Sequence, residues 1–246
     1  MKKSLITCDV NGCFFCKNCL PEWKPAILAN KKKLYVKKNE IIFKEGDPVK
    51  GIYFVLSGNV KVHKKWGRDK EVIIRFASNG AIFGHRGMGE TIYPVSATAI
   101  EEGVVCYFDM GFFETSLKVN HDFTYELMMF FAKDLQESEN KMRNLAHMPV
   151  KGRVAQALIL LESQFGITAD GFINIKLSRQ DLASFTGATY ETVFRVINKL
   201  LNENIITLHD KNIKVTNKEK LLQLTADEGI AEDQSDNYAN PLARKI

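Results

Sequence analysis

The chain has 246 residues, enough for one or two domains that each bury a core. Its hydrophobic content of 45% and charged content of 26% are those of an ordinary soluble globular protein, and no stretch is apolar and long enough to span a membrane. A net charge of +5 permits nucleic-acid binding without establishing it, because the charge of the local surface matters more than the total.

The two ends of the chain are predicted to lie outside the folded core. No apolar segment of a secretion signal follows the basic start Met1-Lys2-Lys3, so we expect a cytoplasmic protein with reduced thiols. The segment from Thr225 onward is acidic, polar and poor in large apolar residues. We therefore expect a disordered tail over residues 225–246.

Most of the cysteines are concentrated near the N-terminus. Four of the five are Cys8, Cys13, Cys16 and Cys19, and the fifth is Cys106. In a reducing compartment, thiols spaced this closely favour a metal site or a redox switch over structural disulfides. Thiolates suit both zinc and iron–sulfur clusters. Taken alone, Cys106 is typical of a buried thiol in a strand, because residues 104–108 are mostly apolar.

Residues 34–108 show short β-prone runs that are broken by glycine turns. The runs cover residues 34–36, 40–43, 51–56, 60–62 and 72–76. Many short strands at regular spacing favour a sandwich or barrel. The segments 43–47 (FKEGD) and 53–58 (YFVLSG) resemble the cyclic-nucleotide-binding β-roll.

A long helix is predicted from about residue 123 to residue 148. Its apolar residues recur in three- and four-residue steps, as in the seam of a coiled coil: Met128, Phe131, Leu135, Met142 and Leu145. Packing of this stripe on the chain's own β-roll is the alternative, but the length of the helix favours pairing with a second copy. After Pro149, residues 150–153 are predicted to form a hinge, followed by a supporting helix over 153–165.

Residues 177–202 are predicted to form two short helices joined by a tight turn. Ser178 and Asp181 resemble a capping box, Gly187 ends the first helix, and Thr189 suits the N-cap of the second. In the second helix, apolar residues recur on one face: Val193, Val196, Ile197, Leu200 and Leu201. Two β-prone runs follow, over residues 205–208 and 213–215, and predict a hairpin.

The opposite face of the second helix carries side chains that suit the DNA major groove. Glu191 and Arg195 lie one turn apart, with Phe194 between them. A carboxylate can accept from the cytosine amino group, a guanidinium can donate two hydrogen bonds to guanine, and an aromatic ring can touch a thymine methyl group. A surface ion pair beside a partly buried aromatic ring is the alternative interpretation of this spacing.

Together, the two helices, the hairpin and the run 190–195 (YETVFR) resemble the CRP/FNR family of bacterial transcription regulators, over about residues 34–225. In that family the recognition helix reads bases with Glu and Arg, which implies base contacts by Glu191 and Arg195. The other residues implied in DNA binding are Ser178, Arg179, Thr189, Tyr190, Phe194 and Lys199. We find no nucleophile–base constellation and no phosphate loop, so we expect no enzyme.

The resemblance implies an α+β fold in five parts. These are a cysteine-rich extension (residues 1–24), a cyclic-nucleotide-binding-like β-roll (25–121), a dimerisation helix (122–149), a winged helix-turn-helix (150–224) and the tail (225–246). It also implies a homodimer that binds double-stranded DNA with TGA-type half-sites, works with RNA polymerase and does not enter a membrane.

In the FNR-like branch of the family, three N-terminal cysteines and one barrel cysteine hold an oxygen-labile [4Fe–4S] cluster. Cys106 stands where the barrel cysteine is found, and Cys13, Cys16 and Cys19 are the favoured trio, with Cys8 a possible substitute. The spacing departs from the FNR pattern, in which a longer gap precedes the third N-terminal ligand. Structural zinc or a thiol sensor, with a small molecule bound in the β-roll as the signal, is the alternative.

Cyclic-AMP-responsive relatives bind the ribose with a Glu and the phosphate with an Arg-Ser pair. In this chain His85 occupies the Glu position and Val95 the Arg position. A cyclic phosphate would therefore lack a strong charge-assisted contact, and we expect no tight binding of cyclic AMP. Arg86 could supply a charge from another direction, although an ion pair on the roll is its simpler role. His85 is assigned no metal, because no second ligand accompanies it.

Overall fold

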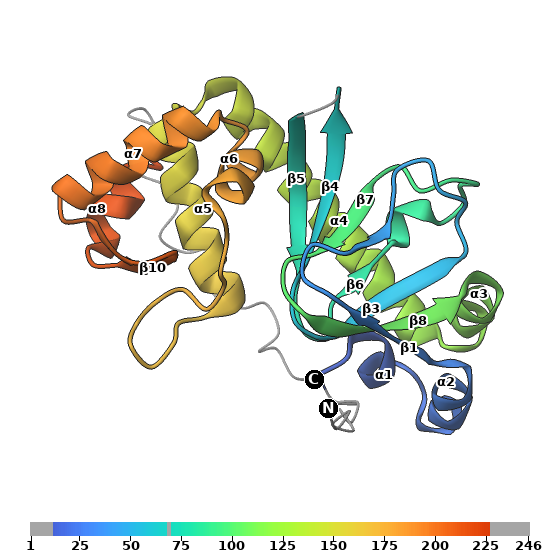
Figure 1. The fold of residues 1–246 in the computed structure, drawn as a ribbon. Coiled ribbons are helices and arrows are strands. Elements are labelled where there is room, and N and C mark those ends of the chain that lie inside the picture. Colours follow the sequence, from blue (N-terminus) through green and yellow to red (C-terminus); the bar gives the residue numbers. More distant parts are fainter. Residues whose placement is uncertain (1–11, 68–69, 227–246) are drawn as a thin grey trace. The chain divides into compact units, whose positions relative to one another are not determined.

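The computed structural model describes residues 12–67 and 70–226, which fall into two compact units (Figure 1). The first unit reaches to residue 142 and also includes residues 176–187. The second unit contains residues 143–175 and the chain from residue 188 on. Cys8 and residues 227–246 of the predicted tail lie outside the described residues.

The first unit is built around two four-stranded sheets. Its strands are β1 (Lys32–Val36), β2 (Ile41–Phe43), β3 (Gly51–Ser57), β4 (Val60–Trp66), β5 (Lys70–Ala77), β6 (Ile82–Phe83), β7 (Ser96–Ala99) and β8 (Gly103–Asp109). The strand orders are β1-β8-β3-β6 and β2-β7-β4-β5, and neighbouring strands pair antiparallel. The predicted β-roll is confirmed, and β6 and β7 are strands that the sequence runs did not include.

Helices complete the first unit. They are α1 (Phe14–Asn18), α2 (Lys24–Asn30), α3 (Met110–Val119), most of α4 (His121–His147) and α6 (Arg179–Thr186), with 3-10 turns η1 (Pro21–Trp23) and η2 (His85–Gly87). The predicted long helix is confirmed as α4, which begins two residues earlier than expected. Phe123 and Leu127 of α4 are buried against the roll, so its N-terminal half belongs to the core of this unit.

Alternating side chains of the central strands divide the core in two. On β3, Tyr53 and Val55 belong to a cluster shared by both sheets, whereas Phe54 belongs to a second cluster that also contains residues of α1, α3 and α4. On β8, Val105 and Cys106 divide in the same way. Because successive side chains of a strand point to opposite faces, Cys106 lies on the helix-covered face of its sheet.

The cysteine-rich segment is anchored to this face by specific contacts. Phe14 N donates to Gly80 O at 2.9 Å, and Leu20 N donates to Asn120 Oδ1 at 2.8 Å. Trp23 Nε1 donates to Ser116 Oγ at 3.0 Å. Phe15 is fully buried, with its ring among those of β3, β8, α3 and α4. Residues 12–30 are therefore an integral layer of the first unit.

The second unit contains α5 (Val150–Phe165), α7 (Tyr190–Asn202), β9 (Ile206–His209), β10 (Asn212–Val215) and α8 (Lys218–Gln223). The predicted hairpin is confirmed as β9 and β10, which pair antiparallel. Among the described residues of the whole chain, no helix has the length and apolar content required to cross a bilayer.

The prediction of a hinge over residues 150–153 is wrong, because α5 begins at Val150 with Pro149 at its N-cap. Arg153 N donates to Pro149 O, as in a regular first turn. A Cβ on Gly152 would lie 2.8 Å from Leu224 O and 2.9 Å from Met148 Cγ. The glycine that suggested flexibility therefore permits close packing inside the second unit.

Candidate DNA-binding surface and cysteine cluster

The first helix of the predicted pair, α6, starts with the capping box expected from the sequence. Ser178 Oγ accepts a hydrogen bond from Asp181 N at 3.0 Å, and Asp181 Oδ2 accepts from Ser178 N at 3.3 Å. Gly187 ends the helix in the left-handed conformation, with φ 63°, which glycine adopts at little cost. These local signals fix both ends of a helix of only eight residues.

The second helix, α7, is capped by Thr189, whose Oγ1 accepts from Thr192 N at 3.3 Å. Its predicted apolar stripe is buried at Val193, Ile197 and Leu200. With that face fixed in the core of the second unit, the helix presents its polar face outward. The geometry suits a helix that lies on its own domain and reads a groove.

All of the predicted DNA contacts on α7 and at its N-cap are exposed: Thr189, Tyr190, Glu191, Phe194, Arg195 and Lys199. The rings of Tyr190 and Phe194 are 43% and 47% exposed and stack with centroids 6.3 Å apart. In contrast, Ser178 and Arg179 at the start of α6 are half-buried. The first six side chains are accessible to a partner, and the last two are less so.

No ion pair joins Glu191 to Arg195 in the described part of the chain, so the alternative drawn from their spacing is not formed. Arg195 Nη2 instead lies 3.4 Å from Thr192 Oγ1, a residue that the sequence did not single out. Lys199 Nζ is exposed and lies 4.0 Å from Glu203 Oε1 at the C-terminal end of the helix. The charged ends of Glu191 and Arg195 thus remain available to base edges.

Four cysteines lie in one apolar cluster of the first unit: Cys13, Cys16, Cys19 and Cys106. Each is buried. Cys13 occupies the N-cap position of α1 without a side-chain cap bond, and Cys16 lies in the first turn. A hydrogen bond with Cys16 lowers the pKa of Cys13 to about 6, whereas burial raises the pKa of Cys19 to about 12. The fold therefore brings the favoured trio and Cys106 to the same face of one sheet.

The donor type, burial and common location of these thiols fit a thiolate-bound metal or iron–sulfur cluster. Their spacing is not that of a finished coordination sphere. Within residues 12–67 and 70–226, no group of three potential ligands is placed to hold an ion. Phe15, Ser116 and Asn120, which position the cysteine segment, could not be found from the sequence because their contacts are distant in the chain.

Two family models match the chain: a cyclic nucleotide-binding domain over residues 33–120 and a Crp-like helix-turn-helix domain over residues 152–224. The cAMP-activated global transcriptional regulator CRP of Salmonella typhimurium is 32% identical over 187 residues, which cover 74% of this chain and 87% of that protein. The chain belongs to the CRP/FNR family of transcription regulators.

This CRP/FNR-family protein is also 28% identical to the Anaerobic regulatory protein of Bacillus subtilis over 200 residues, 80% of this chain and 83% of that protein. Its fold is similar to FixK2 from Bradyrhizobium japonicum, with a TM-score of 0.73, 24% identity, and coverage of 80% of this chain and 98% of that chain. It is therefore a DNA-binding transcription regulator and not an enzyme.

In this CRP/FNR-family protein, His85 and Arg86 at the expected nucleotide-cassette positions contact helix α4 of the same chain. His85 is 1% exposed, and its ring lies against Phe130 and Phe131, with centroids 5.0 and 5.2 Å away. Burial lowers the pKa of His85 to about 4, so the imidazole is neutral at pH 7. Arg86 Nη2 donates to Asp134 Oδ2 at 2.6 Å, which is the ion pair given above as its simpler role.

Proposed function

We propose that this regulator acts as a homodimer on palindromic DNA with TGA-type half-sites, and that it responds to oxygen or redox state through a cysteine-ligated [4Fe–4S] cluster. The observation that carries the sensing proposal is the buried cluster that unites Cys13, Cys16 and Cys19 with the distant Cys106. The Anaerobic regulatory protein of Bacillus subtilis, a relative by sequence, makes the same kind of signal plausible for this chain.

The N-terminal segment can bring its thiols to Cys106 because it is already held against β8 and its neighbours. The Phe14 N to Gly80 O hydrogen bond and the buried ring of Phe15 fix the backbone between Cys13 and Cys16. An iron–sulfur cluster, when bound, would supply an oxygen-labile link between that segment and β8.

The same segment touches the helix that we expect to form the dimer. The Phe14 ring packs against Phe123 and Phe130 of α4, with centroids 5.9 and 5.7 Å away. A change in how the cysteine segment is held would therefore reach α4 through packed rings. Because packed interfaces switch between discrete arrangements, such a change can alter how two copies pair.

The outer face of α4 carries the predicted seam. Four of its five residues are exposed: Met128, Leu135, Met142 and Leu145. The fifth, Phe131, is half-buried against His85, so this position packs partly on the chain's own roll. Exposed apolar side chains repeated along one helix face favour a helical partner.

In the dimer, two copies of α7 would enter major grooves about 34 Å apart. RNA polymerase is the partner that family membership implies.

Cyclic AMP is a poor candidate for the signal. His85 is neutral and buried, Val95 is apolar and buried, and the charge of Arg86 is already paired with Asp134. None of the three offers an unpaired cation to a cyclic phosphate. We therefore expect no tight binding of cyclic AMP, and we propose that the signal enters through the cysteines.

The sensing proposal is tested by anaerobic purification followed by iron, sulfide and zinc analysis. We expect iron and sulfide in equal amounts, and a brown chromophore near about 400 nm, as thiolate-bound clusters commonly show. Cys106→Ser should lose the iron and the colour, and Cys8→Ser is the matched control because it removes a thiol outside the favoured set. A colourless protein with stoichiometric zinc would favour the alternative of a structural metal, with a small molecule as the signal.

The dimer proposal is tested by Leu135→Glu. A carboxylate in an apolar seam loses its hydration without gaining a partner, which costs several kcal/mol in the pair. We expect a monomer by sedimentation or sizing at concentrations where the wild type is a dimer. Gln136→Glu is the matched control, since it adds the same charge to the adjacent exposed position. A Leu135→Glu protein that remains dimeric would mean that the seam lies elsewhere on α4.

A further inference from the structure

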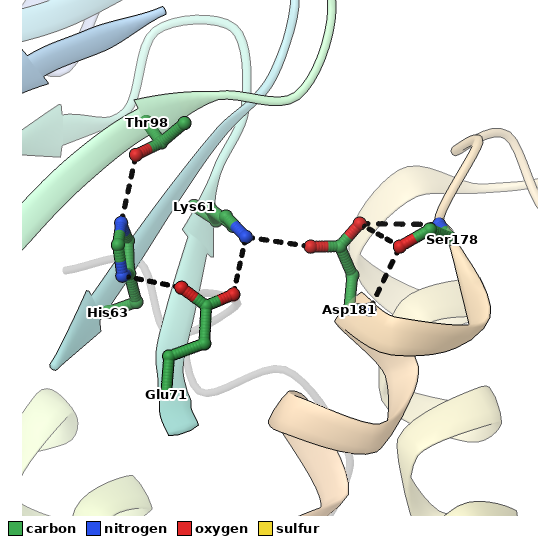
Figure 2. A network of polar contacts seen from close by, with 6 residues as sticks. All are labelled: Lys61, His63, Glu71, Thr98, Ser178 and Asp181. Atoms are coloured by element: carbon green, nitrogen blue, oxygen red, sulfur yellow. Dashed lines mark hydrogen bonds and ion pairs between the residues drawn. The ribbon is translucent and has the colours of Figure 1, made fainter. Parts of the chain in front are cut away.

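A chain of polar contacts joins the β4–β5 pair to helix α6 (Figure 2). Lys61 of β4 donates through Nζ to Glu71 Oε1 of β5 at 2.5 Å and to Asp181 Oδ1 of α6 at 2.8 Å. His63 Nδ1 lies 2.9 Å from Glu71 Oε2, and His63 Nε2 lies 2.8 Å from Thr98 Oγ1 of β7. One ammonium group thus bridges a carboxylate of the sensor roll and a carboxylate of a DNA-binding helix.

The bridge is largely shielded from water. The side chains of Lys61, Glu71 and Asp181 are 15%, 19% and 18% exposed. Contacts with His63 and Lys61 lower the pKa of Glu71 to about 2. Burial opposes the charge on Lys61, but the hydrogen bonds to Asp181 and Glu71 raise its pKa overall. Lys61 and Glu71 are therefore both charged at neutral pH. Ions that are partly buried interact more strongly than a pair on an open surface would.

A second, apolar contact lies beside the ionic one. Phe185 of α6 packs against Phe76 of β5, with ring centroids 4.9 Å apart. The ammonium of Lys141, from α4, lies 4.3 Å from the centroid of the Phe185 ring. Helix α6 is thus held to β4, β5 and α4 by an ion pair near its start and by an aromatic contact near its end, all within the first unit.

Asp181 has two roles at once. Its Oδ2 atom accepts from Ser178 N and Ser178 Oγ and so completes the capping box, as Figure 2 shows, while Oδ1 binds Lys61. The residue that starts α6 is therefore also the residue that ties α6 to the roll. A change in Lys61 leaves the capping box intact, so the two roles can be separated by experiment.

The Lys61–Asp181 ion pair matters because of where α6 lies in the fold. The Crp-like helix-turn-helix match spans residues 152–224 and includes α6, yet α6 belongs to the compact unit of the roll. In a helix-turn-helix, the first helix crosses the DNA backbone while the second reads the bases. Ser178 and Arg179, which the resemblance implies in DNA binding, are half-buried here, whereas the implied contacts of α7 are exposed.

We propose that the Lys61–Asp181 ion pair is an autoinhibitory clamp, which holds the first helix of the helix-turn-helix on the sensor roll and lowers the affinity of the protein for DNA. While the clamp is closed, α6 takes its position from the roll and its N-terminal side chains are partly covered. DNA binding then has to break the clamp, and the free energy of the ion pair is lost from the binding equilibrium. The clamp rests on the DNA-binding function alone and does not require the iron–sulfur cluster.

The clamp predicts that loss of a positive charge increases DNA affinity. Lys61→Gln should bind a duplex, enriched by the wild-type protein from a randomised pool, roughly two- to fivefold more tightly, the factor expected for release of one partly buried ion pair. Lys65→Gln is the matched control, because it removes the same charge from an exposed position on the same strand. The control should bind equally or more weakly, since positive charge ordinarily favours binding to phosphates.

Hydrogen exchange provides the structural readout. The amides of residues 179–186 should exchange faster in Lys61→Gln than in Lys65→Gln, whereas Lys61→Arg, which keeps the charge, should resemble the wild type in exchange and in affinity. Lys61→Met keeps the apolar stem of the side chain and serves if the Gln variant folds poorly. The clamp is overturned if neither Lys61→Gln nor Lys61→Met binds DNA more tightly than Lys65→Gln, or if exchange in α6 is unchanged.

Discussion

Helix α7 carries residues that we propose to read DNA, and helix α1 lies in the segment that we propose to bind an iron–sulfur cluster. The two helices present these residues in opposite ways. α7 has thirteen residues, a Thr189 cap, and a buried apolar stripe opposite its exposed polar face. α1 has five residues, no side-chain cap, and cysteines buried in an aromatic cluster. Helix α7 has a cap of its own and exposes the side chains of its polar face. Helix α1 lacks a side-chain cap and is held by tertiary contacts with the surrounding core.

The difference follows from what each helix is expected to bind. DNA approaches from outside, so side chains that read bases have to be exposed before the partner arrives. A thiolate-bound cluster is stabilised by an apolar shell that limits the access of water, so its ligands gain from burial. In α7, function and stability therefore belong to different faces and can be changed separately. In α1, the same few residues serve both function and stability, so a substitution that alters the function also alters the stability.

The strongest test of this contrast is Phe15→Ala in α1. The ring is fully buried among five others, and truncation of a buried Phe to Ala costs roughly 3–5 kcal/mol. We expect the melting temperature to fall by about 10 °C, measured by circular dichroism. Lys17→Ala, at an exposed position of the same helix, is the control and should melt with the wild type. If Phe15→Ala melts with its control, α1 is not part of the core.

The two helices also differ in how well the sequence predicts them, because α7 depends on local signals and α1 depends on contacts with distant residues. For α7, the cap at Thr189 and the spacing of Val193, Ile197 and Leu200 are local signals, and the structure confirms the helix that they predict. The five residues of α1 are too few for any periodicity, and the residues that it contacts, Gly80 and Phe113 of α3, are far along the chain. Its position could not be predicted for that reason.

Two other elements show the limits of local signals. Residues 150–153 follow Pro149 and include Gly152, and this pattern predicted a hinge. In the structure, Gly152 is instead required by the close approach of Leu224 O. The placement of Cys106 in a strand was predicted correctly, because a short apolar, β-prone run is a local property of the sequence. Which face of the sheet it occupies depends on the pairing of β8 with β3 and β1, which the sequence does not state.

A second test concerns Arg195, on the exposed face of α7. Arg195→Ala should reduce binding to the selected duplex by roughly 10- to 100-fold per half-site, since a two-pronged guanidinium–guanine contact contributes about 1–3 kcal/mol of discrimination. The melting temperature should not change, because Arg195 is exposed and has one weak contact, with Thr192 Oγ1. Binding is measured on the selected duplex and on a scrambled one.

Lys199→Ala is the matched control for Arg195→Ala, since both remove one positive charge from the same helix. A lysine near phosphates should weaken binding to both duplexes by similar factors and reduce the salt dependence, without a change in preference. If Arg195→Ala behaves in the same way as Lys199→Ala, Arg195 contacts the backbone and the base-reading role belongs to another residue.

The smallest expected effect concerns the caps at the starts of the two helices. Thr189→Ala removes the acceptor for Thr192 N and should destabilise the first turn of α7 by about 1 kcal/mol, whereas Thr189→Ser should keep the cap. Hydrogen exchange at Glu191 and Thr192 measures the loss directly. Cys13 occupies the same N-cap position in α1 but makes no cap bond, so α1 should have no comparable dependence on a side-chain acceptor. A Thr189→Ala protein with unchanged exchange would mean that α7, like α1, is held by its surroundings and not by its own ends.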